Sequence, residues 1–382
     1  MKAVLLHSTF APFHLVQLQA AHAAASPSDE LLGLELAGTQ SDYRWPPARP
    51  QGGVRLQTLF PDRELYSIPR KVKAQAIQAA LDSWNPDVVV LPGWGFSHSL
   101  AGLSWCIQHR AARVVICDSH PLREGDGRVK RWLKGFLVRR YQAAFVAGNI
   151  HARYVASFGL PLERCFIGCD TVDNRFFASA PPQPAASRPP TLLSCLRLLP
   201  RKNALGVLEA LAKAPEWHWV LAGDGAQLEE VRATRQRLGL EKRVHLLGHV
   251  PYEELPALYA RADIYLQPSL YEPWGLAVNE AMAASLPVIV SDRCGSAELV
   301  HGEGNGYVFD PTRPDALPSA LNALLARRSE WLAMGAASHR IIQEWGPDLF
   351  ANNFWKASRS ALELNRARPQ PNLMDRAMRF AV

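Results

Sequence analysis

The sequence predicts an α/β protein built from two domains, each with a parallel sheet. The chain has 382 residues, which is more than one ordinary hydrophobic core supports, so two domains are expected. Short apolar runs alternate with longer helical patterns throughout, as in strands joined by crossover helices. Residues 179–190 interrupt this alternation with five prolines in twelve positions. Such a stretch forms no regular element and predicts a semi-rigid linker.

Six strands are predicted on each side of the linker. In the first half they are 3–6, 53–59, 88–91, 114–117, 144–147 and 165–168. In the second half they are 192–196, 217–222, 244–247, 264–267, 288–291 and 307–309. The predicted domains are therefore 1–178 and 191–346, with 179–190 between them, and the segment from 347 to about 364 has a helical pattern.

Composition is that of a soluble globular protein, with 48% hydrophobic and 20% charged residues. The net charge of +7 favours ligands that carry phosphate, or an anionic membrane surface. No aromatic-basic RNA motif or zinc-finger spacing is found, so no nucleic-acid partner is expected. The apolar run at residues 1–7 is too short for the core of a signal peptide, and no apolar run approaches the roughly 20 residues of a membrane span. A reducing cytoplasm is the expected compartment.

The cysteines are scattered along the chain. Cys165 and Cys169 lie four positions apart, but no second pair of Cys or His accompanies them. Buried reduced thiols are therefore expected rather than a zinc site. No Asp-x-Asp motif is present, so no obligate metal and no bound cofactor are predicted.

The segment 271–283 carries the strongest functional signal. It places Glu272 and Glu280 eight positions apart, across a Pro-Trp-Gly turn that opens a helix between two predicted strands. A helix N-terminus at the carboxyl end of a parallel strand suits an anionic ligand. Both carboxylates would repel phosphate, so we expect them to face hydroxyl groups beside it. A ligand with phosphates in the middle and hydroxyls at both ends is a nucleotide sugar.

This stretch resembles the Glu-x7-Glu motif of family 4 retaining glycosyltransferases, the glycosyl transferases group 1. The Pro-Ser before the motif, the Pro-Trp-Gly-Leu inside it and the Glu-Ala-Met-Ala after it carry the resemblance. It implies the GT-B fold, in which two Rossmann-like domains face each other across a cleft, the first binding the acceptor and the second the donor. It also implies that the helix at about 347–382 packs back on the first domain, and that a nucleotide-sugar donor is used with retention of anomeric configuration.

The resemblance also implies roles for residues of the second domain. Glu272 would contact hydroxyls of the donor sugar, and Glu280 the ribose. Residues 196–203 resemble the Arg-Leu-x-x-x-Lys-Gly signature, with Asn203 where glycine is usual. Arg197 and Lys202 would accordingly bind the diphosphate and neutralise it as it leaves, with Arg201 the less favoured neighbour.

Backbone groups and one aromatic side chain complete the implied donor site. Gly275 and Leu276 would offer amides to the phosphate and the sugar. Gly223 would form part of the cleft wall, and Gly248 would meet the base through backbone groups, so the nucleotide cannot be identified. Trp274 stands where the family often has phenylalanine, and either ligand contact or packing of the loop accounts for it.

The first domain departs from the family pattern. Residues 8–14 lack the glycines that usually follow the first strand, which puts a phosphate-binding role for this loop in doubt. Together with the Val-Asp-Asn-Arg-Phe-Phe segment at 172–177, it suggests a bacterial surface-polysaccharide subgroup. His120 is the first candidate to approach the donor sugar, a capping role being the alternative; His98 is second and His14 third.

Residues 128–140 combine six basic positions with apolar ones at helical spacing. One interpretation is a surface helix that packs its apolar side on the sheet. The other is a helix that meets an anionic membrane or a polyprenyl diphosphate acceptor, which would make the protein peripheral on the inner face of the membrane.

The sequence therefore predicts a glycosyltransferase that acts on a sugar or lipid-linked acceptor in polysaccharide or glycolipid assembly. Two alternatives stay open. One is an inverting GT-B enzyme, for which His14 is the only obvious catalytic base. The other is a catalytically silent GT-B protein that serves as a partner in a membrane-associated assembly.

Overall fold

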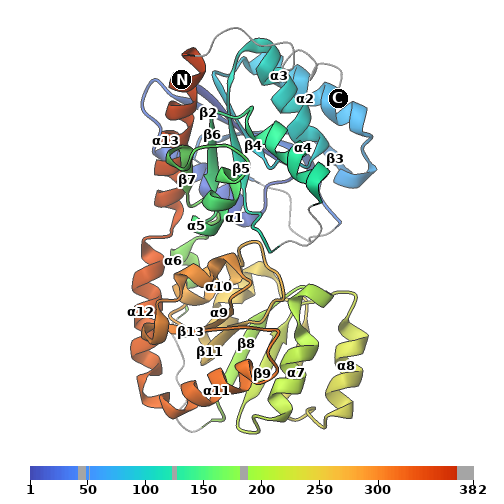
Figure 1. The fold of residues 1–382 in the computed structure, drawn as a ribbon, viewed down its shortest axis with the longest axis vertical. Helices are drawn as coiled ribbons and strands as arrows, with labels where there is room; N and C mark the ends of the chain where they lie inside the picture. The colour runs from blue at the N-terminus through green and yellow to red at the C-terminus, as the bar shows by residue number, and fades with distance from the viewer. Residues whose placement is uncertain (42–48, 51, 123–126, 181–187, 368–382) are drawn as a thin grey trace. The chain divides into compact units, whose positions relative to one another are not determined.

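The computed structural model describes residues 1–41, 49–50, 52–122, 127–180 and 188–367 (Figure 1). They form two compact units. Unit 1 comprises Met1–Thr171 and the segment from Pro347 onward, and unit 2 comprises Val172–Gly346. The division falls before residues 172–178, which the sequence analysis places in the first domain, because α6 (Asn174–Phe177) packs on α9 and α10 of unit 2. Most of the proline-rich segment, 181–187, lies outside the described residues.

Unit 1 is a parallel sheet of seven strands in the order β3-β2-β1-β4-β5-β6-β7. Every pairing between neighbouring strands is parallel. The strands are β1 Lys2–His7, β2 Glu30–Thr39, β3 Arg55–Glu64, β4 Val88–Pro92, β5 Ala112–Cys117, β6 Ala143–Val146 and β7 Cys165–Ile167. The order reverses at β1 and β4, as it does in doubly wound folds.

Strand β2 was not predicted from the sequence. Its central residues are buried on both faces, so the segment lacks the polar alternation of a half-buried strand. Gly33 and Gly38 also interrupt its apolar run. The close packing explains Gly33, because a Cβ there would lie 2.6 Å from the Leu18 side chain.

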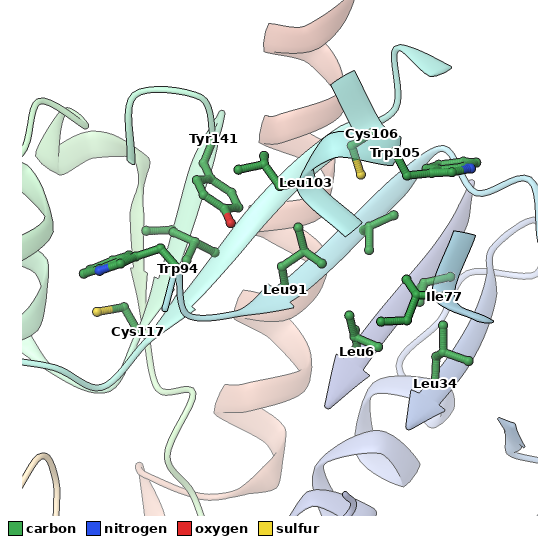
Figure 2. Packing of buried hydrophobic residues seen from close by; sticks show 14 of the residues in the cluster. Leu6, Leu34, Ile77, Leu91, Trp94, Leu103, Trp105, Cys106, Cys117 and Tyr141 are labelled. Atoms are coloured by element: carbon green, nitrogen blue, oxygen red, sulfur yellow. The ribbon is translucent and has the colours of Figure 1, made fainter. Parts of the chain in front are cut away.

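The helices of unit 1 cover both faces of its sheet (Figure 1). They are α1 Pro12–Ala23, α2 Arg70–Trp84, α3 Ser97–His109, α4 Arg128–Val138, α5 Asn149–Ala156 and α13 Pro347–Arg366. On one face, alternate strand residues such as Leu6, Leu34 and Leu91 pack against Ile77 of α2 and Leu103 of α3 (Figure 2). This alternation follows from the two-residue period of a strand.

The opposite face of the sheet is covered by α1 and by α13, which contacts β5, β6 and β7. The ring of Phe350 lies 5.0 Å from that of Phe145 on β6. The indole nitrogen of Trp355 donates a 2.8 Å hydrogen bond to the carbonyl oxygen of Ala21 on α1. The last helix is therefore part of the core of unit 1, although unit 2 precedes it in the chain.

Unit 2 is a parallel sheet of six strands in the order β10-β9-β8-β11-β12-β13. Its strands are β8 Thr191–Cys195, β9 His218–Ala222, β10 Val244–Gly248, β11 Ile264–Gln267, β12 Val288–Ser291 and β13 Gly306–Phe309. The remaining helices are α7 Ala204–Ala212, α8 Leu228–Arg237, α9 Leu255–Ala260, α10 Leu276–Ala283, α11 Ala316–Ala326 and α12 Trp331–Gln343. The strand order reverses between β8 and β11, which is where ligands bind in open α/β sheets. The predicted α/β class with two parallel sheets is confirmed.

Two further observations concern the cysteines and the hydrophobicity of the helices. All six cysteines are free, and four of them are buried. Within the described part of the chain, no helix has both the length and the hydrophobicity needed to cross a bilayer.

Candidate functional site

Two loops meet at the carboxyl ends of β8 and β11 in unit 2. The first follows β8 and includes a single 3-10 turn, η3 (Pro200–Lys202), and the second runs from β11 to α10. The amide of Leu270 donates a 2.8 Å hydrogen bond to the carbonyl oxygen of Arg201, and the side-chain amide of Asn203 donates one of 3.2 Å to that of Pro268. The two loops are therefore joined at the point where the strand order of the sheet reverses, between β8 and β11.

The backbone conformation of Asn203 shows why asparagine can stand where the family signature has glycine. Its φ of 61° lies in the left-handed region, which asparagine tolerates better than most residues other than glycine. The same residue ends η3 and precedes α7. Asparagine therefore supplies the turn that glycine makes elsewhere, and its side chain adds the link to Pro268.

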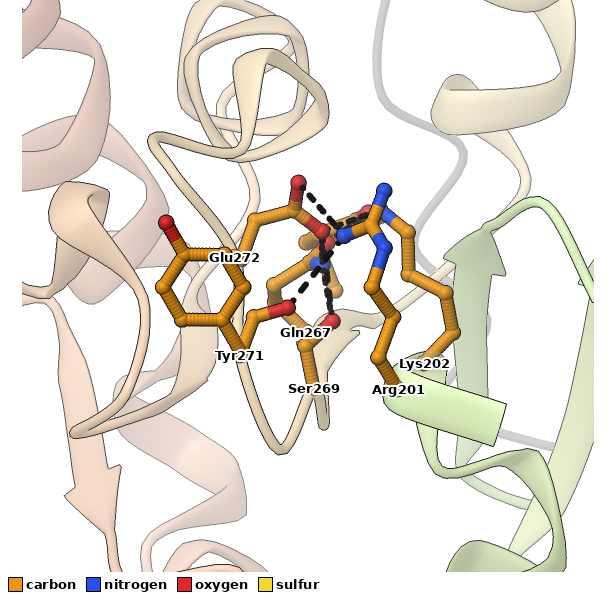
Figure 3. Close-up of polar contacts among 7 residues, drawn as sticks. Arg201, Lys202, Gln267, Ser269, Tyr271 and Glu272 are labelled. Carbon is orange, nitrogen blue, oxygen red and sulfur yellow. Dashed lines mark hydrogen bonds and ion pairs between the residues drawn. The ribbon is translucent and has the colours of Figure 1, made fainter. Parts of the chain in front are cut away.

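Glu272 is the centre of a cluster of charged groups (Figure 3). Lys202 Nζ forms an ion pair with Glu272 Oε2, and an Arg201 guanidinium nitrogen lies 3.4 Å from Oε1. The Glu272 and Lys202 side chains are only 9% and 12% exposed. One carboxylate thus holds two cations, one on each oxygen.

Neutral donors surround the same carboxylate. Ser269 Oγ lies 3.3 Å and Gln267 Nε2 3.4 Å from Glu272 Oε2. Both residues are buried, and Gln267 also accepts a 2.8 Å hydrogen bond from the Tyr265 hydroxyl. Buried charges require such compensation. The sequence Gln-Pro-Ser before the motif thereby acquires a local role: two of its three side chains line the Glu272 carboxylate.

Gly275 places the N-terminus of α10 beside this cluster. Its φ is 105°, and a Cβ at this position would lie 3.0 Å from Ser296 Oγ and 3.4 Å from Glu272 Cγ. No side chain caps the first turn of α10, which begins at Leu276. Backbone amides and the positive end of the helix dipole are therefore available to an anion there.

Trp274 points into unit 2. It is 2% exposed, its ring stacks on Trp345 at 5.4 Å, and its indole nitrogen donates a 2.9 Å hydrogen bond to Asn279 Oδ1. This arrangement favours the packing alternative over contact with a ligand.

Glu280 lies within α10 and accepts a 2.6 Å hydrogen bond from the Tyr259 hydroxyl. Burial raises the pKa of Glu280 to about 7, while the hydrogen bond from Tyr259 acts in the opposite direction. The side chain is half-buried. The carboxyl group is therefore poised to change its protonation state near neutral pH.

Gly223 and Gly248 shape the backbone of the neighbouring loops. A Cβ at Gly223, where φ is 137°, would lie 1.7 Å from the carbonyl oxygen of Leu196. The Gly223 amide donates a 2.7 Å hydrogen bond to the carbonyl oxygen of Gly248. The amide of Leu198 likewise donates to the carbonyl oxygen of Asp224, at 2.8 Å. This turn therefore supports the loop that carries Arg197, which is itself half-buried.

The candidate histidines all belong to unit 1. His120 is 1% exposed, and its Nδ1 accepts a 3.4 Å hydrogen bond from the amide of Leu122, which favours the capping alternative. Burial lowers the pKa of His98 to about 4, and its Nε2 lies 3.1 Å from Ser8 Oγ. Burial lowers the pKa of His14 to about 3, and this ring stacks on His7 at 4.1 Å.

The sequence did not predict the contacts that two residues make with the motif glutamates. The family signature makes Arg201 the less favoured neighbour of Arg197 and Lys202, yet Arg201 contacts Glu272 directly. Tyr259 belongs to no motif, and its hydrogen bond to Glu280 joins two helices, α9 and α10, that no local sequence pattern connects. Among the described residues, no group of three His, Cys, Asp or Glu side chains could hold a metal ion.

The sequence relationships agree with this geometry. Residues 177–340 match the family model of glycosyl transferases group 1. A mannosyltransferase of Mycolicibacterium smegmatis, GDP-mannose-dependent and acting on phosphatidylinositol monomannoside, is 31% identical over 53% of this chain and 57% of its own length. An uncharacterized glycosyltransferase of Methanocaldococcus jannaschii is 35% identical over 35% of each chain. The chain thus spans from about a third to somewhat more than half of the length of these relatives.

Solved structures extend the similarity to nearly the whole fold. HepE of Anabaena, in complex with UDP, superposes with a TM-score of 0.72 over 94% of this chain and 100% of its own, at 18% identity. Sucrose-phosphate synthase of Thermosynechococcus elongatus gives a TM-score of 0.74 over 96% and 100%, at 19% identity. The architecture is that of the GT-B glycosyltransferases, and residues 177–340 of this chain are similar to the glycosyl transferases group 1.

Proposed function

We propose that this protein is a glycosyltransferase that moves a sugar from a nucleotide-sugar donor to a sugar or lipid-linked acceptor with retention of anomeric configuration. The observation that carries the proposal is the Glu272 cluster beside the uncapped N-terminus of α10. A lysine for the diphosphate, amides for phosphate oxygens and a carboxylate for hydroxyls lie together where the strand order of unit 2 reverses. This is the donor set that a nucleotide sugar requires.

Each residue has a role in the proposed reaction. Arg197 and Lys202 neutralise the diphosphate as it leaves, which is the main electrostatic requirement of the step. Gly275 and Leu276 contribute amides, Glu272 orients hydroxyls of the donor sugar, and Glu280 accepts hydrogen bonds from the ribose. The acceptor hydroxyl attacks from the face that the diphosphate leaves and gives its proton to a donor phosphate oxygen. Positioning and charge stabilisation then supply the catalysis, without a protein nucleophile.

The state of His14 supports retention over inversion. A general base works best when its pKa lies near the working pH, whereas burial lowers the pKa of His14 to about 3. Its Nδ1 also accepts a 3.2 Å hydrogen bond from the amide of Ala11. The one candidate base for an inverting reaction is therefore weak and partly engaged.

The names of relatives and neighbours suggest donor and acceptor classes to test. The mycobacterial relatives are named as GDP-mannose-dependent enzymes that act on a phosphatidylinositol mannoside, and an Escherichia coli relative as an O-antigen chain mannosyltransferase. The Anabaena structures hold UDP or UDP-glucose. We therefore propose GDP-mannose and UDP-glucose as the first donors to compare, and polysaccharide or glycolipid assembly as the process.

We further propose that α4 rests on an anionic bilayer. Val129, Trp132 and Leu133 are 73%, 61% and 47% exposed, so these apolar side chains do not pack on the sheet of unit 1. Arg128 and Lys130 are exposed on the same helix. Aromatic and aliphatic groups that penetrate the interface, together with cations that meet lipid phosphates, are the features of a surface-bound helix. This location would bring a lipid-linked acceptor to unit 1.

One experiment tests the proposed chemistry. The purified protein is incubated with a panel of nucleotide sugars, and release of nucleoside diphosphate is measured with and without acceptor. Proton NMR then follows the anomeric configuration of the product. Release from one donor, with an anomer that matches that donor, supports the proposal. An inverted anomer contradicts retention, and the absence of turnover with every donor, despite nucleotide binding, would favour the silent partner protein.

Liposome flotation tests the membrane proposal. Wild-type protein should float with anionic vesicles at low salt, detach from them at high salt, and not bind neutral vesicles. Each basic residue near an anionic surface contributes about 1 kcal/mol to the free energy of binding. Trp132→Ser should reduce flotation. Leu332→Ser, which removes a 66% exposed apolar side chain from unit 2, should not. Equal flotation with neutral and anionic lipid would contradict the proposal.

A further inference from the structure

Arg201 contacts both Glu272 and the backbone of the residue before it. Its guanidinium nitrogen Nη1 lies 3.4 Å from Glu272 Oε1 and donates a 3.2 Å hydrogen bond to the carbonyl oxygen of Tyr271 (Figure 3). Lys202, the next residue, is paired with the other oxygen of the same carboxylate. The two cations therefore bind Glu272 without competing for one oxygen.

The pairing of Lys202 has a consequence for donor binding. Glu272 and Lys202 are largely buried, and each neutralises the charge of the other. If Lys202 is to neutralise a diphosphate, its ammonium group has to move from the carboxylate of Glu272 to the phosphate. A buried carboxylate that loses its only cation is strongly disfavoured. The transfer is therefore favourable only if Glu272 keeps another partner.

The structure provides those partners in place. Arg201 already occupies Oε1, and its side chain is 38% exposed, so it stays with Glu272 at a smaller desolvation penalty than Lys202. Ser269 and Gln267 lie within 3.4 Å of Oε2, the oxygen that Lys202 would leave. After the transfer, Glu272 would still have one cation and two neutral donors.

We propose that Arg201 is a positioning residue that holds Glu272 while Lys202 transfers to the diphosphate of the donor. The inference rests on the proposed function, since it assigns a nucleoside diphosphate group to this site. Arg201 then acts through Glu272 and Lys202 rather than by touching the phosphate. The family signature names two cations on this loop, and this chain uses a third.

A double-mutant cycle tests this coupling. Binding of UDP and of GDP is measured by calorimetry for wild type, Arg201→Ala, Glu272→Gln and the double variant, with folding checked by circular dichroism. Arg201→Ala should weaken binding of the preferred diphosphate about tenfold in the wild-type background, because Lys202 then remains on Glu272. In the Glu272→Gln background the same change should alter affinity less than about twofold, since no carboxylate retains Lys202.

Two controls sharpen the cycle. Arg201→Lys keeps a cation beside Glu272 and should restore most of the affinity. Arg237→Ala removes an equal charge from unit 2 at an exposed pair with Glu209 and should leave affinity unchanged. Equal losses for Arg201→Ala in both backgrounds would overturn the proposal, because they would mean direct contact with the ligand. Wild-type protein that binds neither diphosphate would overturn both this inference and the proposed function.

Discussion

The hydroxyl of Tyr259 donates a 2.6 Å hydrogen bond to the carboxylate of Glu280, and this pair joins α9 to α10. Tyr259 is fully buried and packs edge-on against Phe177, from the segment that opens unit 2. The position of Glu280 is thus fixed by aromatic packing behind it. Because burial also raises the pKa of Glu280 to about 7, the pair makes the ribose end of the proposed donor site sensitive to pH.

We expect donor affinity to rise between pH 6 and pH 8. Ionised Glu280 accepts hydrogen bonds from ribose hydroxyls better than the protonated acid does, and the ionised fraction increases through the pKa of about 7. If only the ionised form binds well, the change is about tenfold. The dissociation constant of a nucleotide sugar, whose diphosphate does not titrate in this range, would be measured at both values. Glu280→Gln should show no such rise, and an equally steep rise in the variant would contradict the assignment.

Glu280→Gln should stabilise the protein at pH 8 but not at pH 4.5. The pKa of Glu280 is raised in the folded state, so the folded state binds the proton more tightly than the unfolded chain. The free energy of unfolding contributed by this group therefore falls as pH rises from about 4.5 to about 7. Glutamine keeps the acceptor for Tyr259 without this penalty, for a gain of about 2 kcal/mol. Thermal unfolding of the variant is compared with that of Glu216→Gln, an exposed change in the same unit; a gain that is independent of pH would refute the burial effect.

Arg197→Ala and Lys202→Ala should each lower turnover by two or more orders of magnitude while the fold is kept. Loss of one cation that stabilises the leaving diphosphate raises the barrier by about 3 kcal/mol. Steady-state kinetics with the donor found in the panel would measure this effect. Arg232→Ala, at an exposed pair with Glu229, is the matched control. Turnover at the wild-type level in either folded variant would remove that residue from the proposed mechanism.

Trp355→Ala should destabilise unit 1 selectively. The side chain is 4% exposed, and its indole nitrogen bonds to the carbonyl of Ala21. Truncation of a buried tryptophan costs about 3–5 kcal/mol, whereas Trp355→Phe should cost less because a ring remains. Hydrogen exchange would show faster exchange in β5, β6 and β7 and no change in unit 2. Lys356→Ala, which changes the exposed neighbour, is the control. Faster exchange in both units would contradict the assignment of α13 to the core of unit 1 alone.

Much of the fold could be predicted because its signals are local. Buried strands such as β4 and β12 are short β-branched runs. The boundary between the units was not predicted, because it falls before Val172 and depends on the packing of α6 against α9 and α10. Glu272 and Glu280 could be selected because their motif lies within one continuous segment. Arg201 and Tyr259 could not, because their importance depends on contacts with residues some 70 and 21 positions away. The orientation of Trp274 likewise depends on Trp345, which no local pattern connects to it.

The discontinuity of unit 1 also sets an order for folding during synthesis. By the time residue 346 has been translated, every strand and helix of unit 2 exists, whereas unit 1 still lacks α13. Until that helix arrives, the surface of β5, β6 and β7 that it covers is exposed to water and to other nascent chains. All residues of unit 2 are therefore translated before the last helix of unit 1 is, although the synthesis of unit 2 begins second. Unit 1 begins to be translated first, yet it cannot cover this face of its sheet until the helix that follows unit 2 has been made, so we expect aggregation during synthesis to begin at that face.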